Sequence, residues 1–555
     1  MLLNKLIGGD LKKILLLFFF LSILSAALFS QTTGRHSVYK NMYGINTEML
    51  ITVPELCENS VQYSQNPPFI PSPDYSNSSY VRWNLSEATG IGNDVAVSGN
   101  GLISANGWSL NNQHLDVYGN ANNTPLWQYG LYPSGYRNYV ATSDTGGLIA
   151  VGAYKNILFF DKGSNTPFFN FDLTTTGDTG TASFLDVTSN GSFVVAGASR
   201  SDSSKILGFA KGSSTYSWRV YIPGGQIYGV RISGNDSLVI VSTYSNYMVL
   251  NTFTGVVRAQ GTISYGTQCA QGISGNGNII ATVNYHGQVR VMQWNGSAYV
   301  QLWQYQEPTG TYYNWINCID ISNDGNYIAA GTLNFLPSST YDGKVRFFKV
   351  SNGNTPIWSY QNTGDEISAI CFSKNGKVLA AVSYGPMDYS KDNIFVFQAN
   401  PGDGIPVFTT KSSGSPFACS LSDDGTTLVT AGKAVHARIM GSGGNVYNIF
   451  VDTNFTPSGI INIPGVIPAE YSLHQNYPNP FNPVTKIKFD VPVSGSIRIS
   501  VYNSTGELVR TLMDGYVKRG SYETYFDGSG LGSGIYYSVM ASGNRREVIK
   551  MALIK

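Results

Sequence analysis

The stretch that decides the fold is Ser322-Asn323-Asp324-Gly325-Asn326-Tyr327-Ile328-Ala329-Ala330-Gly331. An Asp-Gly pair between two apolar runs predicts a tight turn that joins two antiparallel strands. Asp tolerates a left-handed backbone, and glycine adopts a positive φ without steric cost. The same phrase recurs along most of the chain, so the rest of the sequence can be aligned to it.

Eight copies of the phrase align on a hydroxyl residue three places before the turn glycine. These anchor residues are Ser98, Ser143, Thr188, Ser233, Ser274, Ser322, Ser373 and Ser422. They follow at intervals of 45, 45, 45, 41, 48, 51 and 49 residues, and Asp236 replaces the glycine of the fourth copy. Each unit also holds an apolar run, a later alternating run such as Lys344 to Phe348, and often a run with Trp, such as Gln301 to Tyr305. Four short strands in about 45 residues are typical of one propeller blade.

The repeat therefore predicts an all-β protein with an eight-bladed β-propeller over residues 79–451. A seven-bladed propeller is the alternative, should one copy of the phrase be a decoy. The strand-like run Tyr80 to Leu85 precedes the first anchor and matches the fourth strand of a unit. We expect it to close the circle by joining the last three-stranded unit, because this removes an open sheet edge. The run Asn445 to Val451 competes for that place.

One copy of the turn also resembles a known family. Ser373 to Ala380, with the sequence SKNGKVLA, resembles the SxDGxxLA turn of WD-repeat and TolB-like propellers. The Trp-Asp dipeptide of true WD repeats is absent at all eight tryptophans. The resemblance implies a propeller scaffold.

The composition limits the class of partner. Charged residues make up 12% of the chain and the formal net charge is +1, whereas a nucleic-acid partner calls for a strong basic excess. Four of the five cysteines, Cys269, Cys318, Cys371 and Cys419, come just before their anchors on the first strand of successive units. Inner strands of neighbouring blades usually lie too far apart for a disulfide, which needs Cα atoms within about 7 Å. We therefore expect free thiols that pack as small hydrophobic groups.

The segments outside the repeats differ in character. Residues 1–30 combine Lys5, Lys12 and Lys13 with an apolar run from Ile14 to Leu24, which predicts a signal peptide. Residues 31–78 read as an irregular N-terminal arm, and residues 452–470 as a Pro-containing linker. Alternating runs return over residues 471–555 and predict a small Ig-like β-sandwich.

This tail resembles the type A C-terminal sorting domain of the type IX (Por) secretion system. The motif residues are Asn476, Pro478, Asn479, Pro480, Phe481, Asn482, Pro483, Gly534, Lys550 and Met551. The resemblance implies export to the periplasm, passage through the outer membrane by the type IX machinery, and a protein that is secreted or held at the outer surface of a Gram-negative cell. It also implies that the mature chain has no transmembrane helix.

The sequence contains no recognisable catalytic motif. The five histidines lie in different units, and the chain holds no G-x-S-x-G, H-E-x-x-H or P-loop motif. We therefore predict no catalytic residue, metal site or cofactor. The favoured hypothesis is a non-catalytic binding or scaffold protein for protein or glycan partners. A secreted propeller enzyme acting on extracellular glycans, and a structural module of an extracellular assembly, remain alternatives.

A binding surface can still be placed on the propeller. The anchor turns share one face, and the longer loops on the opposite face are rich in aromatic residues. Rings held by a rigid scaffold, with few charges nearby, suit sugar stacking or a protein contact. The candidate ligand-binding residues are Tyr312, Tyr313, Trp315, Phe335, Tyr341, Tyr384 and Tyr389. The alternative is that these rings only pack the loops together.

Overall fold

The computed structural model of the protein describes residues 81–555 apart from short segments. Those segments are residues 111–112, 132–136, 175–179, 201–203, 224, 311–312, 338–339, 362, 400–403, 405, 452, 454–460, 464–467, 494, 518 and 544. The predicted signal peptide, the predicted arm and Tyr312 thus lie outside the described residues. The chain divides into two compact units; the first ends at Val451, and the second runs from Asp452 to Lys555 and also takes in the short stretch Pro401–Val407.

Most of the first unit consists of antiparallel sheets whose strands follow the chain order. Sheet 1 is β2 (Gly90–Val97), β3 (Ile103–Leu110), β4 (His114–Gly119) and β5 (Pro125–Gly130). Sheet 2 is β6 (Asn138–Thr142), β7 (Ile149–Ala153), β8 (Asn156–Phe160) and β9 (Phe169–Asp172). Sheet 3 is β10 (Thr181–Val187), β11 (Phe193–Ser199), β12 (Ser204–Ala210) and β13 (Trp218–Ile222). Sheet 4 is β14 (Ile227–Ile232), β15 (Leu238–Thr243), β16 (Asn246–Asn251) and β17 (Val257–Thr262).

The pattern continues through three further sheets. Sheet 5 is β18 (Gly266–Ile273), β19 (Ile279–Asn284), β20 (Gln288–Trp294) and β21 (Tyr299–Gln306). Sheet 6 is β22 (Trp315–Ile321), β23 (Tyr327–Leu336), β25 (Val345–Lys349) and β26 (Trp358–Tyr360), with β24 (Thr340–Asp342) paired to β23. Sheet 7 is β27 (Ile367–Phe372), β28 (Val378–Ser383), β29 (Ile394–Gln398) and β30 (Pro406–Thr410).

Sheet 8 joins the two ends of the first unit. Its strands are β31 (Ser415–Leu421), β32 (Thr427–Lys433), β33 (Gly444–Phe450) and β1 (Val81–Glu87). The register places Leu85 opposite Val446 and Glu87 opposite Gly444. The prediction that the N-terminal run closes the circle is confirmed, and the competing run supplies the third strand of the same sheet.

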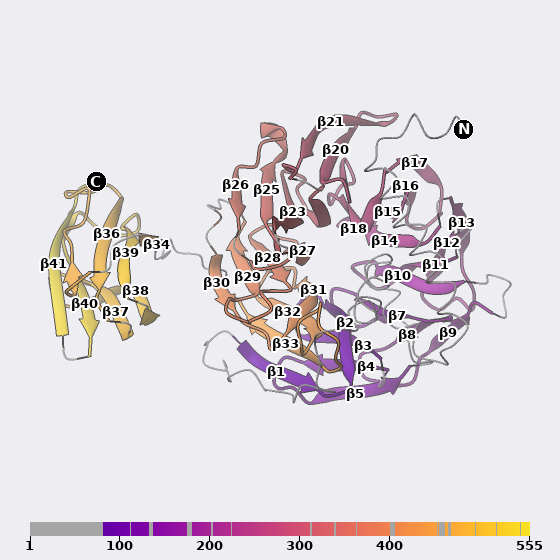
Figure 1. Ribbon diagram of the computed structural model, residues 1–555, viewed down its shortest axis with the longest axis horizontal. Coiled ribbons are helices and arrows are strands. Elements are labelled where there is room, and N and C mark those ends of the chain that lie inside the picture. The colour runs from indigo at the N-terminus through magenta and orange to yellow at the C-terminus, as the bar shows by residue number, and fades with distance from the viewer. Residues whose placement is uncertain are drawn as a thin grey trace, which may run out of the picture. The chain divides into compact units, whose positions relative to one another are not determined.

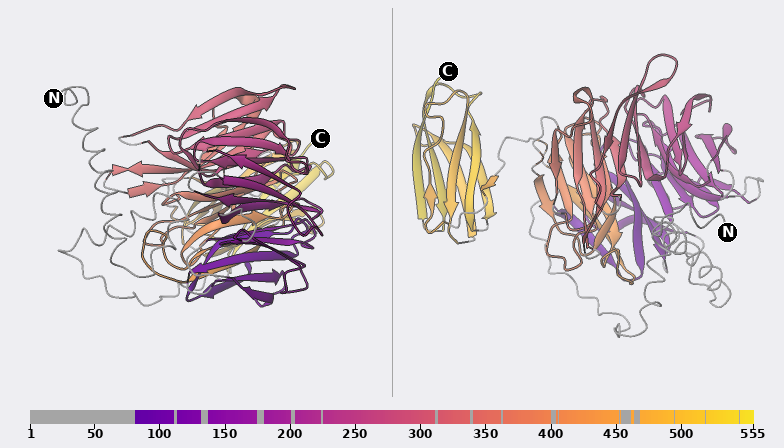
Figure 2. Two further views of the ribbon diagram at one scale, coloured as in Figure 1. Left: turned by 90° about the vertical axis from the view of Figure 1, so that its right-hand side faces the viewer. Right: turned by 45° about the horizontal axis from the view of Figure 1, so that its top comes forward.

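The sheets stand around a ring, with the first strand of each sheet toward the centre (Figure 1). Seen edge-on, the strands run roughly along the axis of the ring (Figure 2). In the described part of the chain, one turn of 3-10 helix, η3 (Val350–Asn352), accompanies the strands. The first unit is thus all-β and propeller-like.

The anchor residues have one geometry in all eight copies. Each anchor hydroxyl accepts a hydrogen bond from the backbone N–H five residues later, at 2.9–3.1 Å. The residue three places after the anchor donates its N–H back to the anchor carbonyl at 2.8–2.9 Å. That residue has a φ of 64° to 76°, and Asp236 adopts it as the glycines do. The anchors are at most 1% exposed, so the hydroxyls satisfy amides that water does not reach.

Neighbouring anchor turns are hydrogen-bonded to one another. Asn100 N–H donates to Asp144 O at 2.8 Å, and Asp144 N–H donates to Ser189 O at 2.9 Å. Equivalent bonds join residues 235 to 275, 275 to 323 and 375 to 423. Asp423 N–H then donates to Gly99 O at 2.8 Å, which returns from sheet 8 to sheet 1. Backbone bonds between turns therefore join six of the eight neighbouring pairs of sheets, and the Asp236 carboxylate joins sheets 3 and 4 by accepting from Ser189 N–H at 2.9 Å.

Aromatic side chains fill the interfaces between sheets. Phe347 of sheet 6 stacks on Trp358 with ring centroids 4.5 Å apart, and Trp358 meets Phe397 of sheet 7 at 5.2 Å. These rings belong to one buried cluster that spans both sheets. The Trp-containing runs of the repeat thus supply packing between sheets.

The second unit contains two four-stranded antiparallel sheets around a common core. One has the order β34 (Ile461–Ile463), β39 (Gly520–Asp527), β36 (Val484–Val491) and β35 (Ser472–Leu473). The other has the order β38 (Leu508–Val517), β37 (Gly495–Asn503), β40 (Gly534–Ser542) and β41 (Arg545–Leu553). Phe489 and Phe526 from the first sheet pack in one cluster with Ile499 and Met551 from the second.

A buried carboxylate joins sheets 5 and 6. Glu307, which follows β21 and is fully buried, accepts two hydrogen bonds from the Arg346 guanidinium at 2.6 and 2.9 Å. Tyr305 Oη and Asn334 Nδ2 also donate to it, at 2.8 and 3.1 Å. Burial works against the charge, but the donors led by Arg346 outweigh it and hold the pKa of Glu307 below its usual value.

Replacing an anchor hydroxyl should weaken the fold. Ser322→Ala leaves the Tyr327 N–H, which bonds to Ser322 Oγ at 2.9 Å, without this acceptor. We expect a loss of about 1–2 kcal/mol in the free energy of unfolding, measured by urea denaturation. The control is Ser214→Ala, at an exposed serine, which should change stability by less than about 0.5 kcal/mol. Equal effects for the two variants would contradict the role given to the anchors.

Glu307→Gln should destabilise the first unit by about 3 kcal/mol, because it removes a fully buried carboxylate and leaves the partly buried Arg346 without its counter-ion. Since the folded-state pKa of Glu307 is lowered, its contribution is fully present above the unfolded pKa of about 4.3 and is lost as the pH falls through the folded value. The wild type should therefore lose more stability than the variant on acidification below pH 5. Asp161→Asn, which breaks the exposed Lys211–Asp161 pair, is the control and should cost less than about 1 kcal/mol. Thermal melts from pH 3 to pH 7 measure both effects.

Candidate binding surface

The predicted binding residues belong to loops on the face opposite the anchor turns. Trp315 begins β22, Phe335 lies near the end of β23, and Tyr341 lies in β24. The structure brings these three rings together. Ring centroids are 5.1 Å apart between Trp315 and Phe335, and 5.8 Å apart between Phe335 and Tyr341, with edge-to-face packing at both steps. Tyr285 extends this row on the other side of Trp315 at 4.7 Å.

An arginine from sheet 8 covers the end of this row. The Arg438 guanidinium carbon lies 3.8 Å from the Tyr341 ring centroid. Asp365 holds the guanidinium with two hydrogen bonds of 2.7 and 2.8 Å, and Glu366 lies 3.5 Å away. Burial opposes the charge on Arg438, but the bonds to Asp365 outweigh it and raise its pKa. The contacts therefore tie the loops of sheets 6, 7 and 8 to one another.

A second row of rings lies on the same face, at the loops of sheets 4, 5 and 6. Ring centroids are 6.2 Å apart between Tyr228 and Tyr244, and 5.6 Å between Tyr244 and Tyr265. His286 then lies between Tyr265 and Tyr313, at 4.4 and 4.7 Å. Tyr265 and Tyr313 are 48% and 55% exposed, so each offers ring surface to solvent. We call these five residues the tyrosine row.

Of this row, the sequence predicted only Tyr313 as a binding residue. The other members could have been found from their equivalent positions in the repeat. Tyr244 and His286 follow the second strands of sheets 4 and 5, β15 and β19, and Phe335 lies near the end of β23, the second strand of sheet 6. Tyr265 precedes β18 as Tyr313 precedes β22. Loop length favoured the long loops of sheets 6 and 7 as the binding site. The short loops of sheets 4 and 5 also carry aromatic residues.

Two predicted ligand-binding residues depart from the expectation of an exposed rim. Tyr384 is 4% exposed and packs edge-to-face on Phe417 at 5.5 Å, because its ring fills space between sheets 7 and 8. Tyr389 is half-buried, and its hydroxyl accepts a hydrogen bond from His436 N–H at 2.7 Å. These two rings pack the loops.

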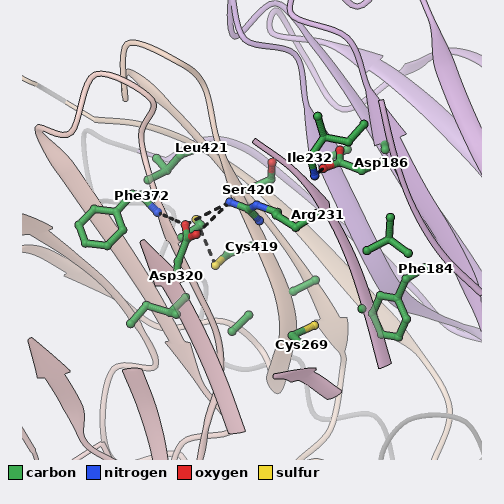
Figure 3. A pocket seen from close by; sticks show the side chains of 18 of the residues that line it. Phe184, Asp186, Arg231, Ile232, Cys269, Asp320, Phe372, Cys419, Ser420 and Leu421 are labelled. Carbon is green, nitrogen blue, oxygen red and sulfur yellow. Dashed lines mark hydrogen bonds and ion pairs between the residues drawn. The ribbon is translucent and has the colours of Figure 1, made fainter. Parts of the chain in front are cut away.

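A polar cavity of about 400 Å³ lies between the inner strands of the first unit. Basic side chains bridge across it between sheets that are not neighbours. Arg231 of β14 reaches both carboxylate oxygens of Asp320 of β22, at 3.1 and 3.2 Å (Figure 3). Lys374, after β27, donates to Asp144 Oδ2 at 2.9 Å and to Ser189 Oγ at 3.0 Å. The Asp320 carboxylate raises the pKa of Arg231, which favours the charged guanidinium.

Aspartates in the cavity wall also join neighbouring inner strands. Asp94 accepts from Val140 N–H at 3.1 Å, and Asp186 accepts from Ile232 N–H at 2.8 Å. Burial raises the pKa of Asp94 to about 6, against the lowering effect of Arg137. Among the described residues, no group of three or more His, Cys, Asp and Glu is placed to hold a metal ion. The charged groups of the cavity are thus engaged in holding the ring together.

Four cysteines line this cavity, and only some match the expected burial. Cys318 and Cys371 are buried as expected, whereas Cys419 is partly exposed and Cys269 is exposed toward the cavity. All four carry free thiols. The Cys371 and Cys419 sulfur atoms lie 3.4 Å apart on β27 and β31, so the expectation that neighbouring inner strands hold such residues well apart is wrong here.

The sorting-motif residues of the tail meet its last strand. Asn476 is buried and its Nδ2 donates to Pro478 O at 3.0 Å and to Thr485 Oγ1 at 2.8 Å. Asn479 Oδ1 accepts from Ala552 N–H at 2.9 Å, and its Nδ2 donates to Lys550 O at 3.2 Å. The motif thus folds into a bonded loop beside β41.

Phe481 also joins the motif loop to β41, from within the core of the tail. It is 2% exposed in the tail core, where Met551 is fully buried. Its N–H donates to Ala552 O at 2.9 Å, and its carbonyl accepts from Ile554 N–H at 3.0 Å. The remaining motif residues lie around this centre: Pro478, Asn479, Pro480, Asn482, Gly534 and Lys550 are exposed, and Pro483 is half-buried. The two separated parts of the motif therefore form one structural feature.

Comparison with known families agrees with both parts of the chain. Among the described residues, no helix has the length and apolar character that a membrane crossing requires. No curated protein matches the chain. Residues 306–349, which include the anchor turn of Ser322, match the family described as WD domain, G-beta repeat. Residues 475–555 match the family described as secretion system C-terminal sorting domain, so the chain combines a WD-like repeat in a propeller-like unit with a tail of the type IX sorting kind.

Proposed function

We propose that this chain is a secreted or cell-surface protein that binds an extracellular protein or glycan without catalysis. In this proposal residues 1–30 are a signal peptide, 31–78 an arm, 79–451 an eight-bladed propeller, 452–470 a linker and 471–555 an Ig-like sorting domain. The tail engages the type IX machinery, and the propeller binds the partner. The observation that carries the binding role is the tyrosine row, which spans three sheets on one face.

The blade count is supported by the anchors. Eight anchors share one turn geometry, and each stands between the first and second strand of its own sheet. A decoy copy would have no reason to keep both the buried hydroxyl and the positive φ. Eight blades are therefore favoured over seven.

Binding at the tyrosine row is supported by its exposure and its rigidity. Tyr265 and Tyr313 expose about half of their surface and flank His286, so part of each ring already contacts another ring. Rings held in this way lose little side-chain entropy when a partner stacks on them. The neighbouring carboxylates Asp365 and Glu366 are buried beside Arg438, which favours a binding surface over an acid–base centre.

The second candidate is a secreted propeller enzyme acting on extracellular glycans. The observation in its favour is that Asp365, His436 and Tyr389 lie close together among the same loops, with His436 Nε2 3.6 Å from Asp365 Oδ2. Release of reducing sugar from soluble polysaccharides by the purified protein, lost in Asp365→Asn, would support the enzyme over the binding protein.

Removal of residues 471–555 should leave the protein in the periplasm, because the tail carries the sorting motif. Cell fractionation and surface labelling of the host measure the outcome. The control is the same tail fused to an unrelated periplasmic protein, which should then reach the cell surface or the medium. Surface display of the truncated chain at the wild-type level would refute the export route.

Tyr265→Ala combined with Tyr313→Ala should weaken partner binding at least tenfold, or about 1.4 kcal/mol, because the stacking surface is lost. The wild type is first screened on an array of bacterial and plant glycans and on whole cells. Leu126→Ala, at an exposed residue of β5, is the control. Both variants should melt within about 2 °C of the wild type, since both sites are exposed. Unchanged binding by the folded double variant would reject this surface.

A further inference from the structure

Two cysteines of the cavity wall form a pair across the boundary between sheets 7 and 8. Cys371 in β27 and Cys419 in β31 are 48 positions apart, and their sulfur atoms lie 3.4 Å from each other. Three residues earlier on the same strands, Ser368 Oγ donates to Pro416 O at 2.7 Å. The two inner strands therefore approach closely and in register at this point.

The separation of the two sulfur atoms is short enough for a bond to form. A disulfide requires an S–S distance of about 2.05 Å, so the atoms need to approach by roughly 1.4 Å. Cys318 differs, because its sulfur lies 3.5 Å from the Ile367 carbonyl oxygen.

Export would expose the two thiols to conditions in which a disulfide can form. A chain with a secretion sorting domain leaves the cytoplasm, where thiols are kept reduced, and enters compartments in which disulfides form and persist. Cys419 is partly exposed and lines the cavity, so an oxidant can reach it there. Cys371 is buried, with its sulfur 3.4 Å from that of Cys419, so it is near enough to attack a mixed disulfide formed there.

We propose that Cys371 and Cys419 form a disulfide between sheets 7 and 8 after export. The oxidant is a disulfide, either that of a periplasmic thiol–disulfide oxidoreductase or that of a small molecule such as oxidised glutathione. The Cys419 thiolate attacks one sulfur of that disulfide, forms a mixed disulfide and releases the other sulfur as a thiolate. The Cys371 thiolate then attacks Cys419 Sγ and releases the second sulfur. The two cysteines lose two electrons and two protons, and the oxidant becomes two thiols.

This bond would link sheet 8, which joins the two ends of the ring, to sheet 7. Sheet 8 contains β1, which returns from the beginning of the described chain and is held to β33 by hydrogen bonds. A covalent link from β31 to β27 fixes sheet 8 to its neighbour at the cavity side. The oxidised protein should therefore resist opening of the ring at sheet 8 better than the reduced protein.

The test uses the full chain without its signal peptide, purified reduced and then incubated with oxidised glutathione. Free thiols are alkylated, and peptides are mapped by mass spectrometry without reduction. We expect a Cys371–Cys419 linked peptide and a melting temperature that falls by at least about 3 °C when reductant is added. Cys269→Ser, which removes another thiol of the cavity, should keep the reductant-dependent change, whereas Cys419→Ser should lose it.

A second arm examines the protein taken from the periplasm of a Gram-negative host and alkylated at lysis. Recovery of the linked peptide there supports the proposal for the exported protein. Alkylation of both Cys371 and Cys419 in both arms would overturn it, and so would pairing of either with a different cysteine. The peptide map of the wild type decides the question even if Cys419→Ser fails to fold. The inference requires export and is independent of binding at the tyrosine row.

Discussion

The hydrogen bond from a backbone amide to the anchor hydroxyl five residues earlier is the interaction on which the ring depends. It closes the turn between the first and second strand of every sheet, and it satisfies an amide that is shielded from water. At six of the eight boundaries between sheets, the turn also exchanges a backbone hydrogen bond with the next turn. These bonds act together with the packing of apolar side chains between neighbouring sheets to hold the ring.

The ring interior uses charge for the same purpose. Asp94, Asp186 and Asp320 each accept an amide from the next inner strand, and Arg231 and Lys374 reach across to sheets that are not adjacent. These groups face a polar cavity in place of an apolar core. Burial of a charge is costly unless the group is paired and hydrogen-bonded, and Asp320, whose side chain is 4% exposed, meets that condition through Arg231 and the Phe372 N–H. The charged groups of the cavity are engaged with one another and with backbone amides, and we therefore place the proposed partner contact at the tyrosine row.

Several predictions from sequence were confirmed because they rest on local chemistry. The anchor turns, six of which contain Asp-Gly or Asn-Gly, predicted a strand pair at each anchor, and the strands are there. The run before Ser98 predicted ring closure, and β1 pairs with β33. The tail motif predicted a sorting domain, and the family match covers residues 475–555. The rim was only partly foreseen: Trp315, Phe335 and Tyr341 do come together, whereas Tyr384 is buried against Phe417.

The sequence by itself determined the strand order, the turn positions and the division into a repeat region and a tail, because these follow from hydrophobic alternation and from turn residues within a few positions of each other. Only the tertiary structure decided which rings share a surface and which thiols meet. Tyr244 follows a strand of sheet 4, His286 follows a strand of sheet 5 and Tyr313 precedes a strand of sheet 6. Cys371 and Cys419 lie 48 positions apart. Such contacts depend on the small rotation from each sheet to the next around the ring, and no local pattern of residues encodes that rotation.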